Sequence, residues 1–293
     1  IKAEKMGFDS LWVEDHLIAM PGGRRCNFAW TVMSSALQAT RQIPFYTGVT
    51  APIMRYHPAI VAQAFATMGA MYPGRVGIGV GSGEPPNEMA IYSGKWPSNN
   101  TRLEMLEEAL TIMNRLWTGA EPIWFAGKYY TLNNAVLLTK PEDKIPVYVS
   151  AIGPRAAKLA GRLGDHLISF ANNPGYVREE LLPNFEAGAK EAGKDPKTME
   201  RTGHFNYVYD PDQVVAPEDL QQDAGTISGG ALERAMSSGI ISIFNSAEDF
   251  IKKIEEMKQM GYDHIAVADS SFGAHAQQAA RFKVWAEVLP HVR

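Results

Sequence analysis

The sequence predicts an α/β protein: a (β/α)8 TIM barrel with insertion segments, whose first strand is absent from the given chain. Three observations predict this fold. A short unit recurs near the start, the middle and the end of the chain. Seven apolar runs indicate strands, with helical patterns between them. The 293 residues also suit one barrel, which takes roughly 250 residues.

The recurring unit is a glycine after an amphipathic run, then an acidic residue, then an apolar strand. It occupies residues 7–15 and 261–269, with a looser third copy at 164–170. Glycine suits the left-handed position that follows a helix, so each copy indicates a helix that ends and a strand that begins. Its spread over the whole chain indicates one repeated βα architecture.

Most of the seven expected strands are continuous apolar runs, which is typical of strands buried on both faces. They are residues 10–13, 45–50, 75–81, 147–151, 166–170, 204–208 and 264–267. The chain opens on a pattern typical of the second half of a helix. We therefore expect the eighth strand, the first of the barrel, to precede the given sequence.

Helices are expected between these strands. Pro58 suits a first helical position and opens a helix over 59–71 whose apolar residues run almost all round, which predicts a buried helix. Thr101 and Glu104 have the spacing of a capping box, and Ser246 suits the cap of a later helix. Apolar stripes indicate the inward faces of these last two helices: Leu103, Leu106, Leu110, Met113 and Trp117 in one, and Phe250, Ile254 and Met257 in the other.

We expect one domain over residues 1–293, since no domain boundary is evident. Two segments interrupt the βα rhythm. Residues 122–139 alternate in polarity around Gly127 and predict a hairpin insertion, whereas residues 210–239 are polar and rich in Gly and Ser and predict an irregular insertion.

Composition excludes several classes of partner. The formal net charge is −4 and no basic stretch occurs, so neither nucleic acid nor an anionic membrane is expected to bind. The single cysteine, Cys26, allows no internal disulfide and suits a reducing cytoplasm. No apolar run reaches the 18 residues or so of a membrane span.

Residues 76–88 form the most informative stretch. Gly77, Gly79, Gly81 and Gly83 alternate with larger residues, so one face of the predicted strand is nearly bare, and something flat or bulky can lie against it. The alternative is a tightly packed barrel strand that ends in a solvated loop. The pattern departs from the dinucleotide-binding glycine fingerprint, so a nucleotide-binding helix turn is not expected.

Polar residues follow several predicted strands, at the end of the barrel where such enzymes place their active sites. The first strand leads into Asp15 and His16, and the third into Glu84. His16 is suited to exchange a proton near neutral pH, and the alternative is a structural hydrogen bond. Gly153 and Arg155 lie at a helix start, where free N–H groups and a guanidinium favour phosphate.

The sequence does not contain the residue patterns of a metal site or of nucleophilic catalysis. No set of His, Asp and Glu has metal-ligand spacing, so no metal is expected. No nucleophilic serine motif occurs, and Cys26 has no histidine placed to activate it.

Three long stretches carry a resemblance to a known family: residues 12–16, 47–68 and 72–88. They resemble the bacterial luciferase-like superfamily and, within it, the branch of oxidoreductases that use the deazaflavin coenzyme F420. The F420-dependent secondary alcohol dehydrogenases and glucose-6-phosphate dehydrogenases are its most similar members. The resemblance runs over residues 1–200 and resumes near 245.

The resemblance implies a barrel whose mouth holds coenzyme F420, and a homodimer. It implies that His16 exchanges the proton of the substrate hydroxyl and that Glu84 serves the cofactor ring as proton partner. It implies a non-prolyl cis peptide between Gly48 and Val49, behind the ring. The remaining cofactor-binding residues that it implies are Asp15, Ala51, Ser82, Gly83, Asn87, Ile152, Gly153, Arg155 and Ala156.

The predicted function is hydride transfer between a CH–OH substrate and coenzyme F420. Residues 171–174 lack the lysine with which the sugar-phosphate enzymes hold phosphate, which favours a small neutral alcohol. Met20 stands where relatives carry tryptophan. Two alternatives stay open: a flavin (FMN)-dependent luciferase-like monooxygenase, and a deazaflavin-binding protein without turnover.

Overall fold

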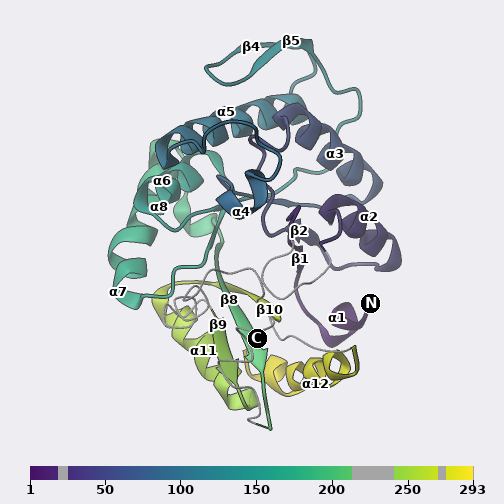
Figure 1. Cartoon of the computed structure of the whole chain (residues 1–293), viewed down its shortest axis with the longest axis vertical. Coiled ribbons are helices and arrows are strands. Elements are labelled where there is room, and N and C mark those ends of the chain that lie inside the picture. The colour runs from purple at the N-terminus through teal and green to yellow at the C-terminus, as the bar shows by residue number, and fades with distance from the viewer. Residues whose placement is uncertain (19–25, 213–240, 270–274, 293) are drawn as a thin grey trace.

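The computed structural model describes residues 1–18, 26–212, 241–269 and 275–292. Its main feature is a curled sheet of parallel strands with helices outside it (Figure 1). The seven predicted strands are all present, with somewhat different ends. They are β1 (Leu11–Val13), β2 (Phe45–Thr47), β3 (Ile78–Val80), β6 (Val147–Ser150), β7 (His166–Ser169), β8 (Arg201–Tyr209) and β10 (His264–Asp269).

The strands follow one another around the curl in chain order. β1 pairs with β2, and isolated bridges at Phe45–Val76 and Thr50–Val80 join β2 to β3. β3 then pairs with β6, β6 with β7, β7 with β8, and β8 with β10, all in parallel. Because every strand runs the same way, their carboxyl ends meet at one edge, and this edge carries the predicted site.

The two outer strands of the curl, β1 and β10, approach each other through side chains. Ser10 Oγ lies 3.3 Å from Nε2 of His264, whereas no described strand pairs with both β1 and β10. Closure into an eight-stranded barrel stays a prediction. The sequence reading missed one short strand, β9 (Ile241–Phe244), which pairs in parallel with the second half of β8.

Helices surround the sheet (Figure 1). The longer ones are α2 (Ala29–Ala39), α3 (Pro58–Met71), α5 (Asn99–Thr118), α6 (Pro154–Leu163), α8 (Leu182–Glu191), α11 (Ala247–Met260) and α12 (His275–Val292). Shorter ones are α1 (Lys2–Met6), α4 (Pro85–Glu88) and α7 (Pro174–Tyr176), with a π-turn at Val177–Leu181 and a 3-10 turn at Pro196–Thr198.

Helix ends agree with the predicted chemistry at some positions and not at others. Gly7 and Gly261 adopt the expected left-handed conformation, with φ of 86° and 106°. Gly164 does not, since its φ is −80°; a side chain there would meet Val149 and the Ala160 carbonyl, so close packing is what requires glycine. Ser246 caps α11 as predicted, in a full capping box with Asp249.

Two helix predictions are corrected. α5 begins at Asn99 with Ser98 as its cap, whose hydroxyl accepts the Thr101 N–H, so the predicted capping box at Thr101 is wrong. α3 is buried on one side only, because Ile60 and Met71 are exposed. The inward stripes of α5 and α11 are buried as predicted.

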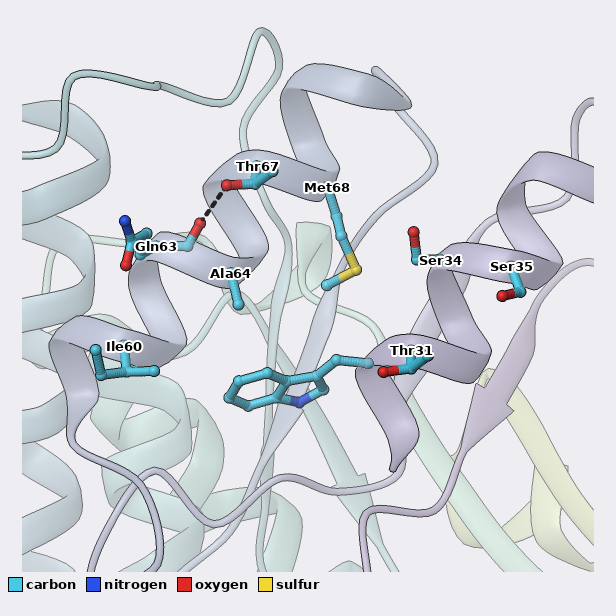
Figure 2. A pocket seen from close by; sticks show the side chains of 9 residues that line it. Thr31, Ser34, Ser35, Ile60, Gln63, Ala64, Thr67 and Met68 are labelled. Atoms are coloured by element: carbon cyan, nitrogen blue, oxygen red, sulfur yellow. Dashed lines mark hydrogen bonds between the residues drawn. The ribbon is translucent and has the colours of Figure 1, made fainter. Parts of the chain in front are cut away.

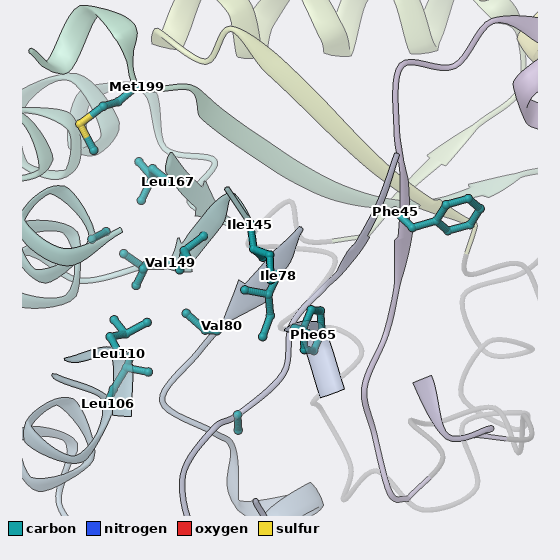
Figure 3. Close-up of a cluster of buried hydrophobic side chains, with 14 of the residues drawn as sticks. Phe45, Phe65, Ile78, Val80, Leu106, Leu110, Ile145, Val149, Leu167 and Met199 are labelled. Carbon is teal, nitrogen blue, oxygen red and sulfur yellow. The ribbon is translucent and has the colours of Figure 1, made fainter. Parts of the chain in front are cut away.

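The hydrophobic core fills the space between sheet and helices. Phe65 of α3, Ile78 and Val80 of β3, and Leu106 and Leu110 of α5 gather around the outer face of β3 (Figure 3). Because these side chains leave β3 outward, the opposite face of the strand points into the curl.

The predicted hairpin insertion is present. β4 (Ile123–Ala126) and β5 (Thr131–Ala135) pair antiparallel and project beyond α5 (Figure 1). The Glu108 carboxylate of α5 accepts the backbone N–H groups of residues 128–130 and so fixes its turn. The predicted irregular insertion over 210–239 lies almost wholly outside the described residues, as does Met20.

Candidate active site at the carboxyl ends of the strands

Two residues that the sequence analysis singled out, from different strands, meet at the mouth of the curl. His16 follows β1 and Glu84 follows β3, and Nε2 of His16 lies 3.1 Å from Oε1 of Glu84. The His16 side chain is 17% exposed and that of Glu84 is 42% exposed. The pair is therefore reached from the mouth but is largely shielded from bulk water.

The charges around His16 favour its protonated form. Burial lowers the pKa of the imidazole, but the hydrogen bond and charge of Glu84, together with the charge of Glu14, outweigh burial. Arg55 acts with burial, and the pKa still lies above its ordinary value. A histidine with such a pKa can hold a proton near neutral pH and exchange it with a bound hydroxyl.

A buried polar network lies directly behind this pair and is centred on Asp15. Its carboxylate, 2% exposed, pairs with Nη2 of Arg55 at 2.6 Å. It also accepts the hydroxyl protons of Thr50 at 2.7 Å and Tyr56 at 3.1 Å. The Asp15 side chain thus faces the protein interior, so its geometry does not support the predicted direct contact with a cofactor.

Asn87 and Glu88 connect the network to the Glu84 loop. The Asn87 amide donates to Oε1 of Glu88 at 2.9 Å, and its oxygen accepts the Leu17 N–H just beyond His16. Oε2 of Glu88 accepts the backbone N–H of Glu84 at 2.6 Å. Burial raises the pKa of the Glu88 carboxyl, whereas this hydrogen bond and the charge of Arg55 lower it, and burial prevails.

Arg55 ties the two loops together. Its Nη2 donates to the Asp15 carbonyl at 2.7 Å, and Nη1 donates to the Asn87 amide oxygen at 3.4 Å. The sequence analysis did not single out Arg55. A signal was nonetheless present, since a basic residue in the segment after the second strand predicts either a site residue or a partner for a buried acid.

The glycine face of β3 is filled by the protein itself. A side chain at Gly79 would meet Val49 at 2.9 Å and Trp12 at 3.2 Å, and one at Gly77 would meet the ring of Tyr46. Something flat or bulky thus lies against this face as predicted, and at these two positions it consists of side chains of the protein. The glycines let the rings of β1 and β2 pack inside the curl, as in the alternative that the sequence left open.

The loop after β3 and the cis peptide after β2 agree with the predictions. Gly83 has a φ of +72°, and its Cα faces the Glu88 carboxylate, so both its conformation and its contacts require glycine. Arg102 donates to the Ser82 carbonyl at 3.0 Å. The peptide between Gly48 and Val49 is cis, as the resemblance implied, and Ala51 is buried just beyond it.

The predicted phosphate site lies at the start of α6. Gly153 precedes the helix, which has no side-chain cap, and within the described part of the chain no atom lies within 4 Å of the position that a Gly153 side chain would take. Ile152 and Arg155 are exposed and Ala156 is half-buried. The Arg155 guanidinium donates to the Asn100 side chain of α5. Free N–H groups, open space and a cation are thus together at one helix end.

Two uncharged rings lie side by side where β7 ends, next to the middle of β8. Phe170 contacts the His204 ring edge-on, with centroids 4.2 Å apart. Burial lowers the pKa of His204 to about 4, so this imidazole is neutral at physiological pH. The sequence analysis named no role for Phe170 or His204, because neither belongs to a motif.

A separate groove lies on the outer surface between α2 and α3, away from these strand ends (Figure 2). Its volume is about 510 Å³, and its lining includes Trp30, Ser34, Ser35, Ile60 and Gln63. The sequences of both helices contain no charged residue.

Within the described ranges, no three His, Cys, Asp or Glu side chains are placed to hold a metal ion. None of the helices there is both long enough and apolar enough to cross a membrane.

Known proteins are similar to this chain in sequence. The F420-dependent glucose-6-phosphate dehydrogenase of Microbacterium testaceum (strain StLB037) is 32% identical, over 100% of this chain and 91% of that protein. The enzyme of the same name from Gordonia bronchialis is 40% identical, over 75% of this chain and 66% of that protein.

Two solved structures are similar to this chain. An F420-dependent secondary alcohol dehydrogenase, solved in complex with an F420-acetone adduct, matches with a TM-score of 0.86 and 40% identity, over 100% of this chain and 93% of that one. The coenzyme F420 dependent tetrahydromethanopterin reductase from Methanopyrus kandleri matches with a TM-score of 0.77 at 23% identity, which indicates a shared fold. The family model described as luciferase-like monooxygenase matches residues 2–283, and the chain therefore belongs to that family.

Proposed function

We propose that the chain is an F420-dependent oxidoreductase that transfers a hydride between a small neutral alcohol and coenzyme F420. The observation that carries this proposal is the His16–Glu84 pair at the mouth, 3.1 Å apart. It supplies the proton chemistry that an alcohol dehydrogenase needs. The similarity to an alcohol dehydrogenase and to sugar-phosphate dehydrogenases, all dependent on F420, supports the cofactor and the reaction class.

A deazaflavin held at the mouth would supply the acceptor for the hydride of the carbinol carbon. The protein handles the other product, the hydroxyl proton. His16 takes that proton at Nε2, and the charges of Glu84 and Glu14 stabilise the resulting imidazolium. Glu84 would serve the cofactor ring as its proton partner. The network behind them keeps Glu84 in place through the Glu88 carboxylate.

The residues around the mouth fit this cofactor. A deazaflavin with a phosphate-bearing tail needs a site for an anion and a site for a flat ring. The start of α6 offers uncapped N–H groups and the space beside Gly153, and Arg155 adds positive charge. Those residues would hold the tail, with Ile152 and Ala156. Gly48, Val49, Ala51, Ser82, Gly83 and Asn87 would line the ring.

We assign Asp15 a structural part in the site in place of the predicted contact with the cofactor. Its carboxylate is occupied by Arg55, Thr50 and Tyr56. It therefore serves the site by fixing the loop that carries His16.

An uncharged lining supports a neutral substrate. Residues 170–175 contain no lysine or arginine, and the Asn173 side chain is used to cap α7. His204 is neutral at physiological pH, because burial lowers its pKa to about 4. A sugar phosphate bound here would lack a cation among the described residues of this loop, whereas a short alcohol needs none.

The proposal includes a homodimer. α2 and α3 present a surface without charged side chains, and this surface holds the groove of Figure 2 together with exposed Val32 and Ile60. Interface cores are depleted of charge in the same way. A single species of twice the chain mass in sedimentation would support the dimer, and a monomer at micromolar concentration would contradict it.

The function is tested by mixing. The purified protein is added to oxidised F420 and, separately, to FMN, and binding is followed by fluorescence quenching. Isopropanol or glucose 6-phosphate is then added without oxygen, and the visible absorbance of the cofactor is recorded. We expect F420 to bind and isopropanol to bleach it.

The other outcomes separate the alternatives. Bleaching by the sugar phosphate alone would contradict the neutral substrate. Binding of FMN alone would contradict the cofactor and favour a monooxygenase. Tight binding of F420 without bleaching by any alcohol of a short secondary and primary series would indicate a binding protein without turnover.

A further inference from the structure

The two ring nitrogens of His16 have unlike surroundings. Nε2 contacts Glu84, whereas Nδ1 is buried and has no hydrogen-bond partner among the residues that the structure describes. Oε2 of Glu14 lies 3.9 Å from Nδ1, which is too far for a hydrogen bond. Buried polar atoms are nearly always bonded in folded proteins, so an unpartnered nitrogen beside a carboxylate needs an explanation.

Glu14 is free to make the missing contact. Its side chain is 60% exposed, and side chains at such positions change rotamer within nanoseconds. A movement of about 1 Å brings its carboxylate within hydrogen-bond distance of Nδ1. His16 itself is held more firmly, because the adjoining Leu17 N–H donates to Asn87. The approach is therefore made by Glu14.

A histidine that acts as a base is commonly oriented by a third group on its other nitrogen. We propose that Glu14 is this positioning residue. It accepts a hydrogen bond from Nδ1–H of His16, so that Nε2 leaves its contact with Glu84 when the alcohol binds and uses its lone pair to take the proton of the substrate hydroxyl. The O–H bond breaks, an N–H bond forms at Nε2, and the positive charge on the ring lies between two carboxylates. The proposal rests on the proposed function for its kinetic consequences only.

The charged groups that face His16 are Glu84 from the end of β3, Glu14 from the end of β1, and Arg55 from the segment between β2 and α3. Removal of the Glu14 charge removes one of the two attractions that favour the imidazolium. The pKa of His16 must then fall. This holds whether or not any cofactor or alcohol is bound.

The first test therefore uses the free protein. The His16 ring is titrated by NMR in the parent and in Glu14→Gln, which keeps the size and an acceptor oxygen but removes the charge. Glu121→Gln, at an exposed position away from the mouth, is the matched control. We expect a lower His16 pKa in Glu14→Gln and an unchanged one in the control. Equal pKa values in the parent and Glu14→Gln would overturn the proposal.

The second test measures alcohol oxidation against pH. In Glu14→Gln the rising limb of kcat/KM is expected to move to lower pH, because the base is deprotonated earlier. The maximal kcat is expected to fall about two- to fivefold, the range of an exposed ion pair, with little change in KM. Glu14→Ala also loses the acceptor oxygen and should lose more. A purely structural role would leave the limb in place.

Together, the titration of His16 and the pH profile of alcohol oxidation test this proposal separately from the proposed function. If the parent oxidises alcohol and Glu14→Gln keeps the parent's pH profile, Glu14 has no part in the reaction. If the parent reduces F420 with no alcohol, the proposed function fails. The titration of His16 then decides alone whether Glu14 acts on that ring.

Discussion

Two histidines, one after β1 and one within β8, show how differently two sides of the curl are built. His16, on the side of β1 to β3, lies among carboxylates that raise its pKa. His204, on the side of β7 and β8, packs against Phe170, and burial lowers its pKa to about 4. The same residue type therefore carries a proton on one side and stays neutral on the other.

The surroundings of His16 and the start of α6 also differ in how tightly their groups are fixed. Behind His16 and Glu84, the buried groups Asp15, Arg55 and Asn87 join the two loops. At the start of α6, by contrast, Gly153 faces open space. Proton chemistry needs a fixed geometry, whereas a binding surface for a cofactor tail gains its contacts from the ligand. The difference is what the proposed function requires.

The largest effect is expected when the charged side loses its buried cation. Arg55→Met leaves Asp15 buried without a counter-charge. Removal of one partner from a buried ion pair costs about 3–5 kcal/mol, and we expect a loss of this size in the free energy of unfolding. Urea unfolding followed by tryptophan fluorescence measures it.

The control for this change is Arg155→Met on the open side. The Arg155 side chain is exposed, so its loss is expected to change stability by about 0.5 kcal/mol or less. Equal losses for the two arginines would show that the network behind His16 is no more important to the fold than a surface contact.

These contrasts mark the limit of what the sequence could predict. The strands, the strand-end residues His16 and Glu84, and the cis peptide follow from apolar runs and from the family motifs. The sequence does not show which side chains pack against the glycine face of β3. Trp12 and Tyr46 come from other strands, and only the curvature of the sheet places them against it. Asp15 was predicted at the site, but the long-range contact with Arg55 decides which way it faces.

A smaller effect is expected on the neutral side as the pH falls. The pKa of His204 is about 4 in the folded state and near 6.5 in the unfolded state. Between these values the unfolded state binds a proton at this residue and the folded state does not. Stability therefore falls with pH, by about 1 kcal/mol between pH 7 and pH 5.5. His204→Leu should lose this slope, whereas His291→Gln, at an exposed position, should keep it.

His16 gives the opposite sign. Its folded-state pKa is raised, so its contribution to stability is complete below the unfolded value and is lost as the pH rises through the folded value. His16→Asn should flatten the decline of stability above neutral pH. Unfolding free energies measured from pH 5 to pH 9 for the parent and both variants separate the two histidines. A common sign for both would contradict the comparison.

The smallest effect is expected at the open start of α6. Arg155→Gln removes one exposed charge from the proposed tail site, and we expect F420 to bind about fivefold more weakly, with a reduced dependence on salt. Arg115→Gln, at an exposed position of α5, serves as the control. Unchanged affinity in Arg155→Gln would place the cofactor tail elsewhere.

The measurement that tests the central claim most directly is a single turnover with isopropanol and F420, without oxygen, for the parent, His16→Asn and Glu84→Gln. The account predicts rapid bleaching by the parent. Each variant should react at least about 100-fold more slowly while F420 still binds, since general acid–base groups contribute factors of about 10² to 10⁴. Variants that bleach F420 as fast as the parent would contradict the assignment of this pair.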